Sequence, residues 1–202
     1  MPSSRSLLAA WSGLAAALAA LLVPLAAGYL EPGYSHVSQF ISELGAHGAR
    51  HGALVSLAGF GAIGVLVLVF LGASGRSLPR SGATLAGLVC FGAVGAAYLA
   101  AAVFRCDAGC PASGSMSQSV HNLFGLLEYV GAFAGLLLLG WGLRGWRTVA
   151  AASVVAAVFV LAGFLGMASA ELEAYRGISQ RIAEAAIFLW IGYVSVALSR
   201  AD

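Results

Sequence analysis

Three of the four histidines of this chain lie in one polar segment of an otherwise apolar sequence. His36, His47 and His51 fall within or just before residues 38–52, SQFISELGAHGARHG, which also contain Glu43. Imidazole and carboxylate groups are zinc ligands in proteins, and they are also the commonest general acids and bases. The segment is therefore the first candidate for a chemical function.

Ionisable side chains also occur inside the later apolar runs of the sequence. Glu128 lies two helical turns after His121, and Glu184 lies one turn after Arg181. A charge at the centre of a membrane costs at least ~2.5–3.5 kcal/mol on insertion scales, so such side chains normally face the interior of a bundle. We expect Arg181 to pair with Glu184 or to reach Glu128. The pair is either a structural salt bridge or part of a site that handles protons or substrate.

Membrane-spanning helices must position these residues. The chain is 60% hydrophobic and 9% charged, whereas soluble domains are ~45–50% apolar. A helix crosses the hydrocarbon core with ~20 apolar residues. Runs of this length cover residues 7–30, 53–73, 83–104, 120–143, 149–170 and 178–198. The sequence therefore predicts an all-α polytopic membrane protein, a single six-transmembrane-helix bundle over residues 1–202.

The first apolar run has an alternative interpretation as a secretory signal peptide. Arg5 precedes it, and Ala26-Ala27-Gly28 offers a small-residue cleavage site. The run is nevertheless longer than the ~7–15 apolar residues of a signal region. We therefore expect it to be the first spanning helix.

A short helix is predicted between the first two spans. Ser35 is a suitable N-cap for residues 35–44, and Gly45 is a suitable stop. Its apolar side chains would share one face, so we expect it to lie in the membrane interface.

The placement of arginine predicts the orientation of the bundle. The chain has no lysine, and six of its ten arginines fall on one side of the predicted spans: Arg5, Arg76, Arg80, Arg144, Arg147 and Arg200. Positive residues mark the cytoplasmic side. Both termini are thus expected in the cytoplasm, with the protein in the cell inner membrane and its lipids as partners. The net charge of +2, without a basic stripe, gives no reason to expect nucleic acid.

The segment CDAGC, from Cys106 to Cys110, falls in a connection on the outward side. Disulfides persist in oxidising compartments, so we expect these two cysteines to be bonded to each other. A metal-binding pair is the alternative, although the sequence has no second cysteine pair. Cys90 lies within a span and is expected to be a small buried side chain.

Together these residues predict a polar pocket that opens outward. Its rim would be formed by His36, Glu43, His47, His51, Asp107 and His121, and its floor by Glu128, Arg181 and Glu184. Three histidines and an acid would hold zinc with an open position for an activated water; the candidate ligands are His47, His51, His121 and Asp107. The absence of an HExxH motif leaves the metal open, and a b-type haem between His51 and His121 is a further alternative.

Four stretches resemble a known family. They are YSHVSQFISELGA, CDAGCP, SVHNLFG and YRGISQRIAE, the last followed by Trp190. In this order they resemble the prokaryotic integral membrane family catalogued as domain of unknown function 998. More distantly, the chain is similar to six-span proteins of the DRAM and Frag type. The resemblance implies six spans and no particular reaction, and it points to Ser42, Glu43, His121, Gln180 and Arg181 as site residues.

The sequence leaves the function open between an enzyme and a binding protein. In the first hypothesis the protein modifies a lipid or lipid-linked substrate, with metal-assisted hydrolysis as one form. His121, Glu43 and Glu128 would then be catalytic, and the substrate would be bound by Arg181, Glu184, Gln180 and Ser42. In the second hypothesis the polar cluster stabilises a non-catalytic subunit of a membrane complex. The sequence does not fix the oligomeric state.

Overall fold

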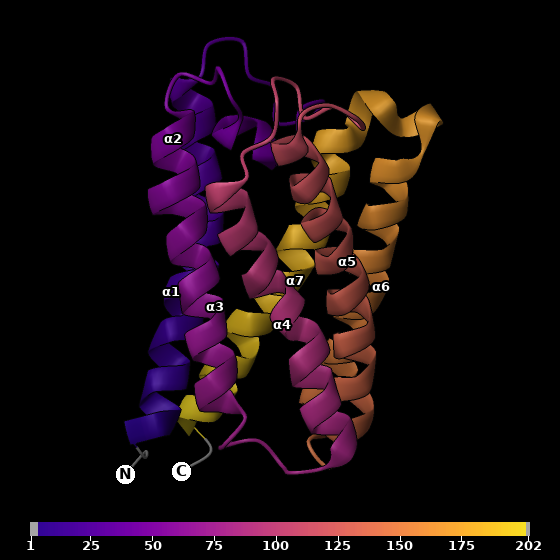
Figure 1. Cartoon of the computed structure of the whole chain (residues 1–202). Helices are drawn as coiled ribbons and strands as arrows, with labels where there is room; N and C mark the ends of the chain where they lie inside the picture. The colour runs from indigo at the N-terminus through magenta and orange to yellow at the C-terminus, as the bar shows by residue number, and fades with distance from the viewer. Residues whose placement is uncertain (1–3, 201–202) are drawn as a thin grey trace.

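The computed structural model describes residues 4–200 and shows a bundle of helices (Figure 1). The α-helices are α1 (Ser4–Leu30), α2 (Gly52–Leu54), α3 (Gly61–Ser74), α4 (Gly82–Val103), α5 (Met116–Gly142), α6 (Arg147–Ala168) and α7 (Arg176–Arg200). The other helical segments are the 3₁₀-helices η1 (Ile41–Gly45) and η3 (Ala170–Tyr175) and the π-helix η2 (Val55–Phe60). No strand occurs between residues 4 and 200, so the predicted all-α class is confirmed. Residues 1–3 and 201–202 of the predicted domain, and the side chain of Arg5, lie outside the described part.

Six helical stretches are long and apolar enough to cross a membrane, as predicted. They are Ser6–Leu30, Gly52–Ser74, Gly82–Val103, Met116–Gly142, Arg147–Ala168 and Ala170–Arg200. The second stretch joins α2, η2 and α3 into one continuous helix. Each helix satisfies its own backbone hydrogen bonds, which a chain in lipid requires. The chain is a multi-pass integral membrane protein.

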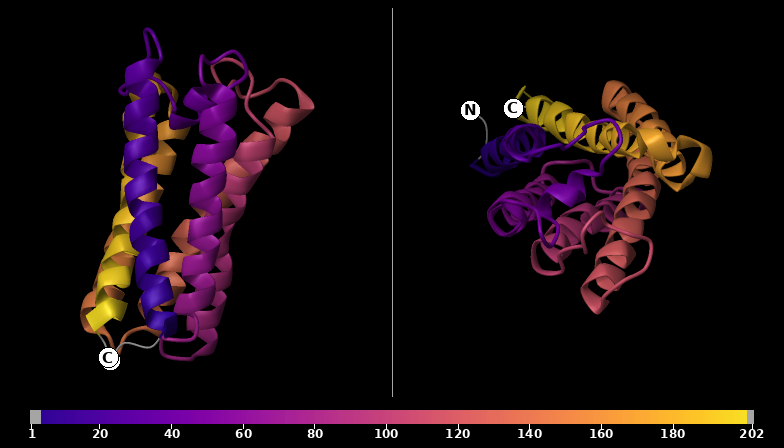
Figure 2. Two further views of the ribbon diagram at one scale, coloured as in Figure 1. Left: turned by 90° about the vertical axis from the view of Figure 1, so that its left-hand side faces the viewer. Right: turned by 90° about the horizontal axis from the view of Figure 1, so that it is seen from above.

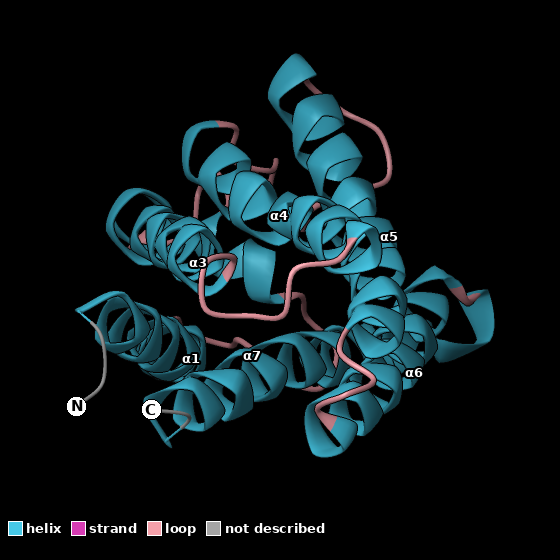
Figure 3. Ribbon diagram, turned by 90° about the horizontal axis from the view of Figure 1, so that it is seen from below, coloured by secondary structure: helices cyan, strands magenta, loops and turns pink. Residues whose placement is uncertain are grey.

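The spanning helices form a ring in chain order. α1 packs on α3, α3 on α4, α4 on α5, α5 on α6 and α6 on α7, and α7 closes the ring by packing on α1 (Figures 2 and 3). Both ends of the described chain lie at the same end of the bundle (Figure 1). The opposite end, called the distal end below, carries the connections 31–51, 104–115 and 169–175.

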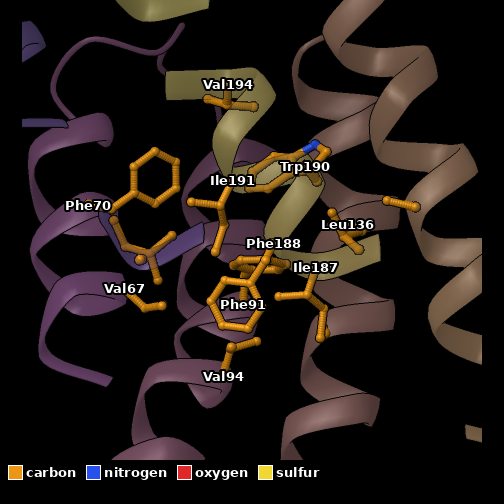
Figure 4. Close-up of a cluster of buried hydrophobic side chains, with 14 of the residues drawn as sticks. Val67, Phe70, Phe91, Val94, Leu136, Ile187, Phe188, Trp190, Ile191 and Val194 are labelled. Atoms are coloured by element: carbon orange, nitrogen blue, oxygen red, sulfur yellow. The ribbon is translucent and has the colours of Figure 1, made fainter. Parts of the chain in front are cut away.

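A cluster of buried aromatic and aliphatic side chains packs in the interior of the bundle (Figure 4). Trp190 of α7 lies 4.9 Å from Phe91 and 6.4 Å from Phe70 between ring centroids. These rings are buried, and the indole Nε1 of Trp190 donates a 2.9 Å hydrogen bond to Ser153 Oγ. Every polar atom of this core cluster therefore has a partner, as a buried indole requires.

Glycines bring α4 and α5 into close contact. A Cβ atom added at Gly135 would lie 2.8 Å from the backbone oxygen of Gly87 and 2.8 Å from the backbone nitrogen of Phe91. A Cβ at Gly131 would lie 2.6 Å from the backbone oxygen of Cys90. Small residues at such positions let backbones approach, and dispersion then holds the helices together.

The predicted helix over residues 35–44 is wrong in its extent, because only Ile41–Gly45 is helical. Phe40 is extended (φ −64°, ψ 150°), so a helix cannot run through it. Ser35 caps a separate turn, in which its Oγ accepts from the amides of Val37 and Ser38. Ile41 and Leu44 are buried, so η1 packs into the distal end of the bundle instead of lying flat on an interface.

Candidate functional site

A cavity of about 710 Å³ lies at the distal end of the bundle. Side chains of α4, α5, α6 and α7 line it, together with residues of η1, η2 and η3, Ser42 of η1 among them, and Cys110 of the disulfide loop. Its volume is within the ~300–1,000 Å³ range of pockets that enclose small ligands. Five residues predicted for the site contribute to its lining: Ser42, His121, Glu128, Gln180 and Glu184.

Glu184 is fixed in the cavity wall by two tyrosines. Its Oε1 accepts a 2.8 Å hydrogen bond from the Tyr129 hydroxyl, and its Oε2 accepts one of 2.9 Å from the Tyr98 hydroxyl. Gln180 continues this network, since its Nε2 donates to the Tyr129 hydroxyl at 3.2 Å and its Oε1 accepts from the amide of Ile41 at 2.6 Å. The network joins α4, α5 and α7 to η1.

Glu128 lines the same cavity without being held in this way. Its side chain is only 7% exposed, yet its Oε1 has no hydrogen-bond partner. No cation compensates it either, because the one ion pair between residues 4 and 200 joins Arg176 to Glu43. Buried polar atoms are nearly always paired in native proteins. Glu128 therefore carries a buried oxygen without a partner in the wall of the cavity.

His121 presents one free ring nitrogen. Its Nδ1 lies 3.0 Å from the backbone oxygen of Phe104. A carbonyl only accepts, so Nδ1 carries the hydrogen, and Nε2 of the neutral ring holds the lone pair. His121 lines the cavity, which places a base and the unpartnered acid Glu128 in one lining.

The predicted pairing of Arg181 with Glu184 or Glu128 is wrong. The Nη1 of Arg181 donates to the backbone oxygens of Gln39 and Gly177, at 3.1 and 2.9 Å. Its Nη2 bonds to the Tyr34 hydroxyl at 2.7 Å and to His36 Nδ1 at 2.9 Å. Three groups of the first connection and the Gly177 carbonyl of α7 thus occupy both terminal nitrogens, while the Tyr98 and Tyr129 hydroxyls occupy Glu184.

The charge of Arg181 affects the pKa values of its partners Tyr34 and His36. Burial raises the pKa of Tyr34, and the hydrogen bond and charge of Arg181 partly offset this rise. Burial lowers the pKa of His36, and the charge of Arg181 lowers it further. A neutral His36 accepts at Nδ1, so both effects favour the bond that the structure shows.

Glu43 is held in a structural environment and does not line the cavity. Its Oε1 accepts from the amide of Phe40 at 2.9 Å and pairs with Arg176 Nη2 at 3.2 Å. Its Oε2 accepts from Gln39 Nε2 at 2.9 Å. Arg176 also donates to the backbone oxygen of Ser38. The pair thus fixes the first connection to the start of α7.

The structure does not bring the four predicted zinc ligands together. His47 and His51 are exposed and do not line the cavity. Asp107 bonds to the amide and hydroxyl of Ser115, which lower its pKa, with a smaller effect from the charge of His47. Within residues 4–200 the one group of three close candidate ligands is Cys106, Cys110 and His121.

The two cysteines of that group are joined to each other, so the predicted Cys106–Cys110 disulfide is confirmed. Disulfide sulfurs are not thiolates, and the thiolate is the form that binds metal. The haem alternative also lacks its geometry, since exposed His51 is not part of the cavity lining to which His121 contributes.

Sequence analysis missed three residues of the site. Tyr98 and Tyr129 hold Glu184, and Arg176 holds Glu43. The position of each tyrosine inside an apolar run could have indicated this role, because a buried tyrosine hydroxyl needs a hydrogen-bond partner. Tyr129 directly follows Glu128 in the sequence.

Near the cavity, the second spanning helix contains one π-helical segment, η2. The wider turn carries Ser56, whose Oγ donates to the backbone oxygen of Gly45 at 3.0 Å, and it ends at Phe60 in the cavity wall. Single π-helical turns occur frequently at functional sites.

A ring of six spanning helices with buried carboxyl groups around a distal cavity defines an integral membrane protein with an internal polar site. The chain belongs to the family described as "Protein of unknown function (DUF998)", whose sequence profile matches residues 14–197. No curated protein and no solved structure matched the chain.

Proposed function

We propose that the distal cavity binds an amphipathic molecule from the membrane, a lipid or a lipid-linked compound. The observation that carries this proposal is the unpartnered Oε1 of Glu128, buried in the wall of a cavity of about 710 Å³. A polar group of the ligand that donates a hydrogen bond, such as a hydroxyl, amide or ammonium group, would satisfy that oxygen.

The remaining lining supports an amphipathic ligand. Phe60, Phe164 and Met167 give the cavity apolar walls, while Glu128 and Glu184 give it an acidic floor. Ligand pockets are typically apolar with a few polar groups that fix orientation. Leu126 belongs to the lining and is half-exposed on α5, which supports access for a ligand from the surrounding lipid.

The arrangement also supports a particular orientation in the inner membrane. Arg76, Arg80, Arg144 and Arg147 lie in or beside the connections at the end that carries the termini, and positive residues favour the cytoplasmic side. The disulfide belongs to the distal connection 104–115, and disulfides favour an oxidising compartment. We infer that the cavity serves the outer leaflet.

The first test fills the cavity. A Cβ atom at Gly125 would meet no heavy atom within 4 Å, and Gly125 lines the cavity, so Gly125→Phe places a ring there without a clash at its base. Gly92 of α4 is equally free of neighbours and lies outside the lining, so Gly92→Phe is the matched control. The protein is extracted in polymer-bounded native membrane discs, and the lipids that remain after delipidation are identified by mass spectrometry. We expect one species that wild type and Gly92→Phe retain and Gly125→Phe loses. Identical lipids in all three would contradict the proposal.

The second test separates binding from structure. Glu128→Leu removes an unpaired acceptor and should lose the retained species without a loss of stability, because no hydrogen bond is broken. Glu184→Leu should lower the unfolding temperature, because it leaves the Tyr98 and Tyr129 hydroxyls without their acceptor. If Glu128→Leu retains the species, Glu128 does not bind the ligand.

A second candidate function, hydrolysis of such a compound, is favoured by the free Nε2 of His121 in the same lining. A base at this position would activate a water, a contribution of typically ~10²–10⁴-fold. His121→Gln should lower turnover of the retained lipid by this factor, with exposed His51→Gln as the control. Equal turnover in the two variants would leave binding as the function.

A further inference from the structure

A second hollow lies between α1 and α7. It measures about 340 Å³, and apart from His36, Arg181 and Glu184 every side chain in its lining is apolar. On α7 the lining extends from Arg181 to Leu189, a rise of about 12 Å at ~1.5 Å per residue. The hollow is therefore an apolar groove with a cationic end. It is defined below as the α1–α7 groove.

The groove opens on the face of the bundle that lipid covers. Leu21 and Leu25 of α1 and Leu189 of α7 line it and are 57%, 49% and 73% exposed. Both helices are membrane-spanning stretches. A molecule in the groove therefore lies in contact with the acyl chains of the bilayer.

Arg181 at the groove's end forms no ion pair with an acid of the described residues. The only ion pair among the described residues is Arg176–Glu43. The groups that bond to Arg181 are two carbonyls, the Tyr34 hydroxyl and the Nδ1 of His36. The Nε–H donates to no group in the described part of the chain. A guanidinium beside an apolar surface normally pairs with a carboxylate or a phosphate.

We propose that the α1–α7 groove holds an acyl chain of an anionic membrane phospholipid, whose phosphate contacts Arg181. The length of the groove accepts the upper part of one chain, and its cationic end accepts the head group. Glu184 in the same lining is engaged by its two tyrosines, so it does not neutralise Arg181. The linings of the groove and the distal cavity share Ile41 and Glu184, whereas Glu128 and His121 line the cavity only. This proposal therefore does not depend on contacts of Glu128 or His121 with a ligand of that cavity.

The test compares two lipids with identical chains. Delipidated wild-type protein in detergent is titrated with dioleoyl phosphatidylglycerol or dioleoyl phosphatidylcholine, and bound lipid is counted by native mass spectrometry. We expect one molecule of phosphatidylglycerol to bind about fivefold more tightly than phosphatidylcholine. The reason is that a basic residue near an anionic lipid contributes ~1 kcal/mol to binding, which corresponds to this ratio of dissociation constants. Equal binding of the two lipids would overturn the proposal.

Variants separate the chain from the head group. Ala185 is exposed and lines the groove, so Ala185→Phe fills it from α7, with exposed Ala151→Phe on α6 as the control. We expect Ala185→Phe to abolish binding of the single anionic lipid and Ala151→Phe to retain it. Arg181→Gln should reduce the preference for the anionic lipid to unity. If Arg181→Gln does not fold, the Ala185→Phe pair decides alone, and retention by Ala185→Phe overturns the proposal.

A third experiment distinguishes binding of a phospholipid from binding of a free anion at Arg181. Inorganic phosphate in excess should leave the bound phospholipid in place, because it supplies no chain for the groove. Displacement of the lipid by phosphate would show that Arg181 holds an anion only, and would overturn the assignment of the groove.

Discussion

The two halves of this bundle differ in how completely their interiors are packed and their buried polar atoms are hydrogen-bonded. In the half near the termini, the buried Trp190 contacts the buried rings of Phe70 and Phe91, and its indole nitrogen is hydrogen-bonded. In the distal half, a cavity of about 710 Å³ remains, and the buried Glu128 has an oxygen without a partner. The same six helices thus form a filled core at one level and an unfilled one at another.

This difference in packing separates the part of the bundle that stabilises the fold from the part that could bind a ligand. Close packing and satisfied polar atoms stabilise a bundle, so the core half explains why the protein folds. An unfilled space and an unpaired acceptor cost stability, and a protein retains them where a ligand supplies the missing contacts. The predictions below test whether the two halves respond to mutation as this contrast requires.

The largest expected effect lies in the packed half. Trp190→Ala removes the ring that contacts Phe70 and Phe91 and leaves Ser153 Oγ without its donor. We expect a loss of about 3–5 kcal/mol in the free energy of unfolding, as for other buried Trp→Ala changes. Trp141→Ala, at a ring that is 68% exposed, is the control. Unfolding in detergent, followed by circular dichroism, measures both, and equal losses would break the contrast.

A somewhat smaller effect is expected at the contact of α4 with α5. Gly135→Ala places a methyl group 2.8 Å from backbone atoms of Gly87 and Phe91, and backbone atoms cannot rotate away. Overpacking of this kind costs typically ~1–3 kcal/mol, and we expect the upper end. Gly92→Ala meets no atom within 4 Å and should be neutral or stabilising. A neutral Gly135→Ala would show that the helices part easily.

Loss of the disulfide should affect the distal half by a smaller amount. The double variant Cys106→Ser, Cys110→Ser opens a ring of five residues, for which the chain-entropy estimate is about 2 kcal/mol. Cys110 lines the cavity, so binding of the retained lipid should weaken as well. Cys90→Ser keeps the bridge and is the control. The measurement is thermal unfolding with and without dithiothreitol, and reductant should have no further effect on the double variant.

The fold was predictable because its cause is local. A run of about 20 apolar residues specifies a spanning helix wherever it occurs, and all six runs became helices. The Cys106–Cys110 bond was predictable for the same reason, since both residues lie in one short connection.

The site was predictable only where it lies on these helices. The cavity lining includes His121, Glu128, Gln180 and Glu184, whose positions follow from helical spacing. The partners of Arg181 did not follow from spacing, because Tyr34 and His36 are more than 140 positions away in the sequence. The path of the first connection decides those contacts, and no periodic pattern encodes it. The exposed side chains of His47 and His51 have the same explanation.

The smallest effect is a pH dependence confined to the distal half. Burial lowers the pKa of His36, and the charge of Arg181 lowers it further, so the unfolded chain takes up this proton at a higher pH than the folded chain does. Stability from this residue is therefore unchanged above the unfolded pKa of ~6.5 and falls as the pH drops below it. Protonation also ends the ability of Nδ1 to accept from Arg181.

We expect a lower unfolding temperature at about pH 5.5 than at about pH 7.5. The dependence of the unfolding temperature on pH should be flatter in His36→Gln, whereas His51→Gln, at an exposed residue, should retain the wild-type slope. Asp107 does not interfere, because its pKa is lowered by hydrogen bonds from Ser115, and its contribution is lost only as the pH falls below ~3.9. A slope that survives in His36→Gln would move the pH sensitivity to another group and remove this distinction between the two halves.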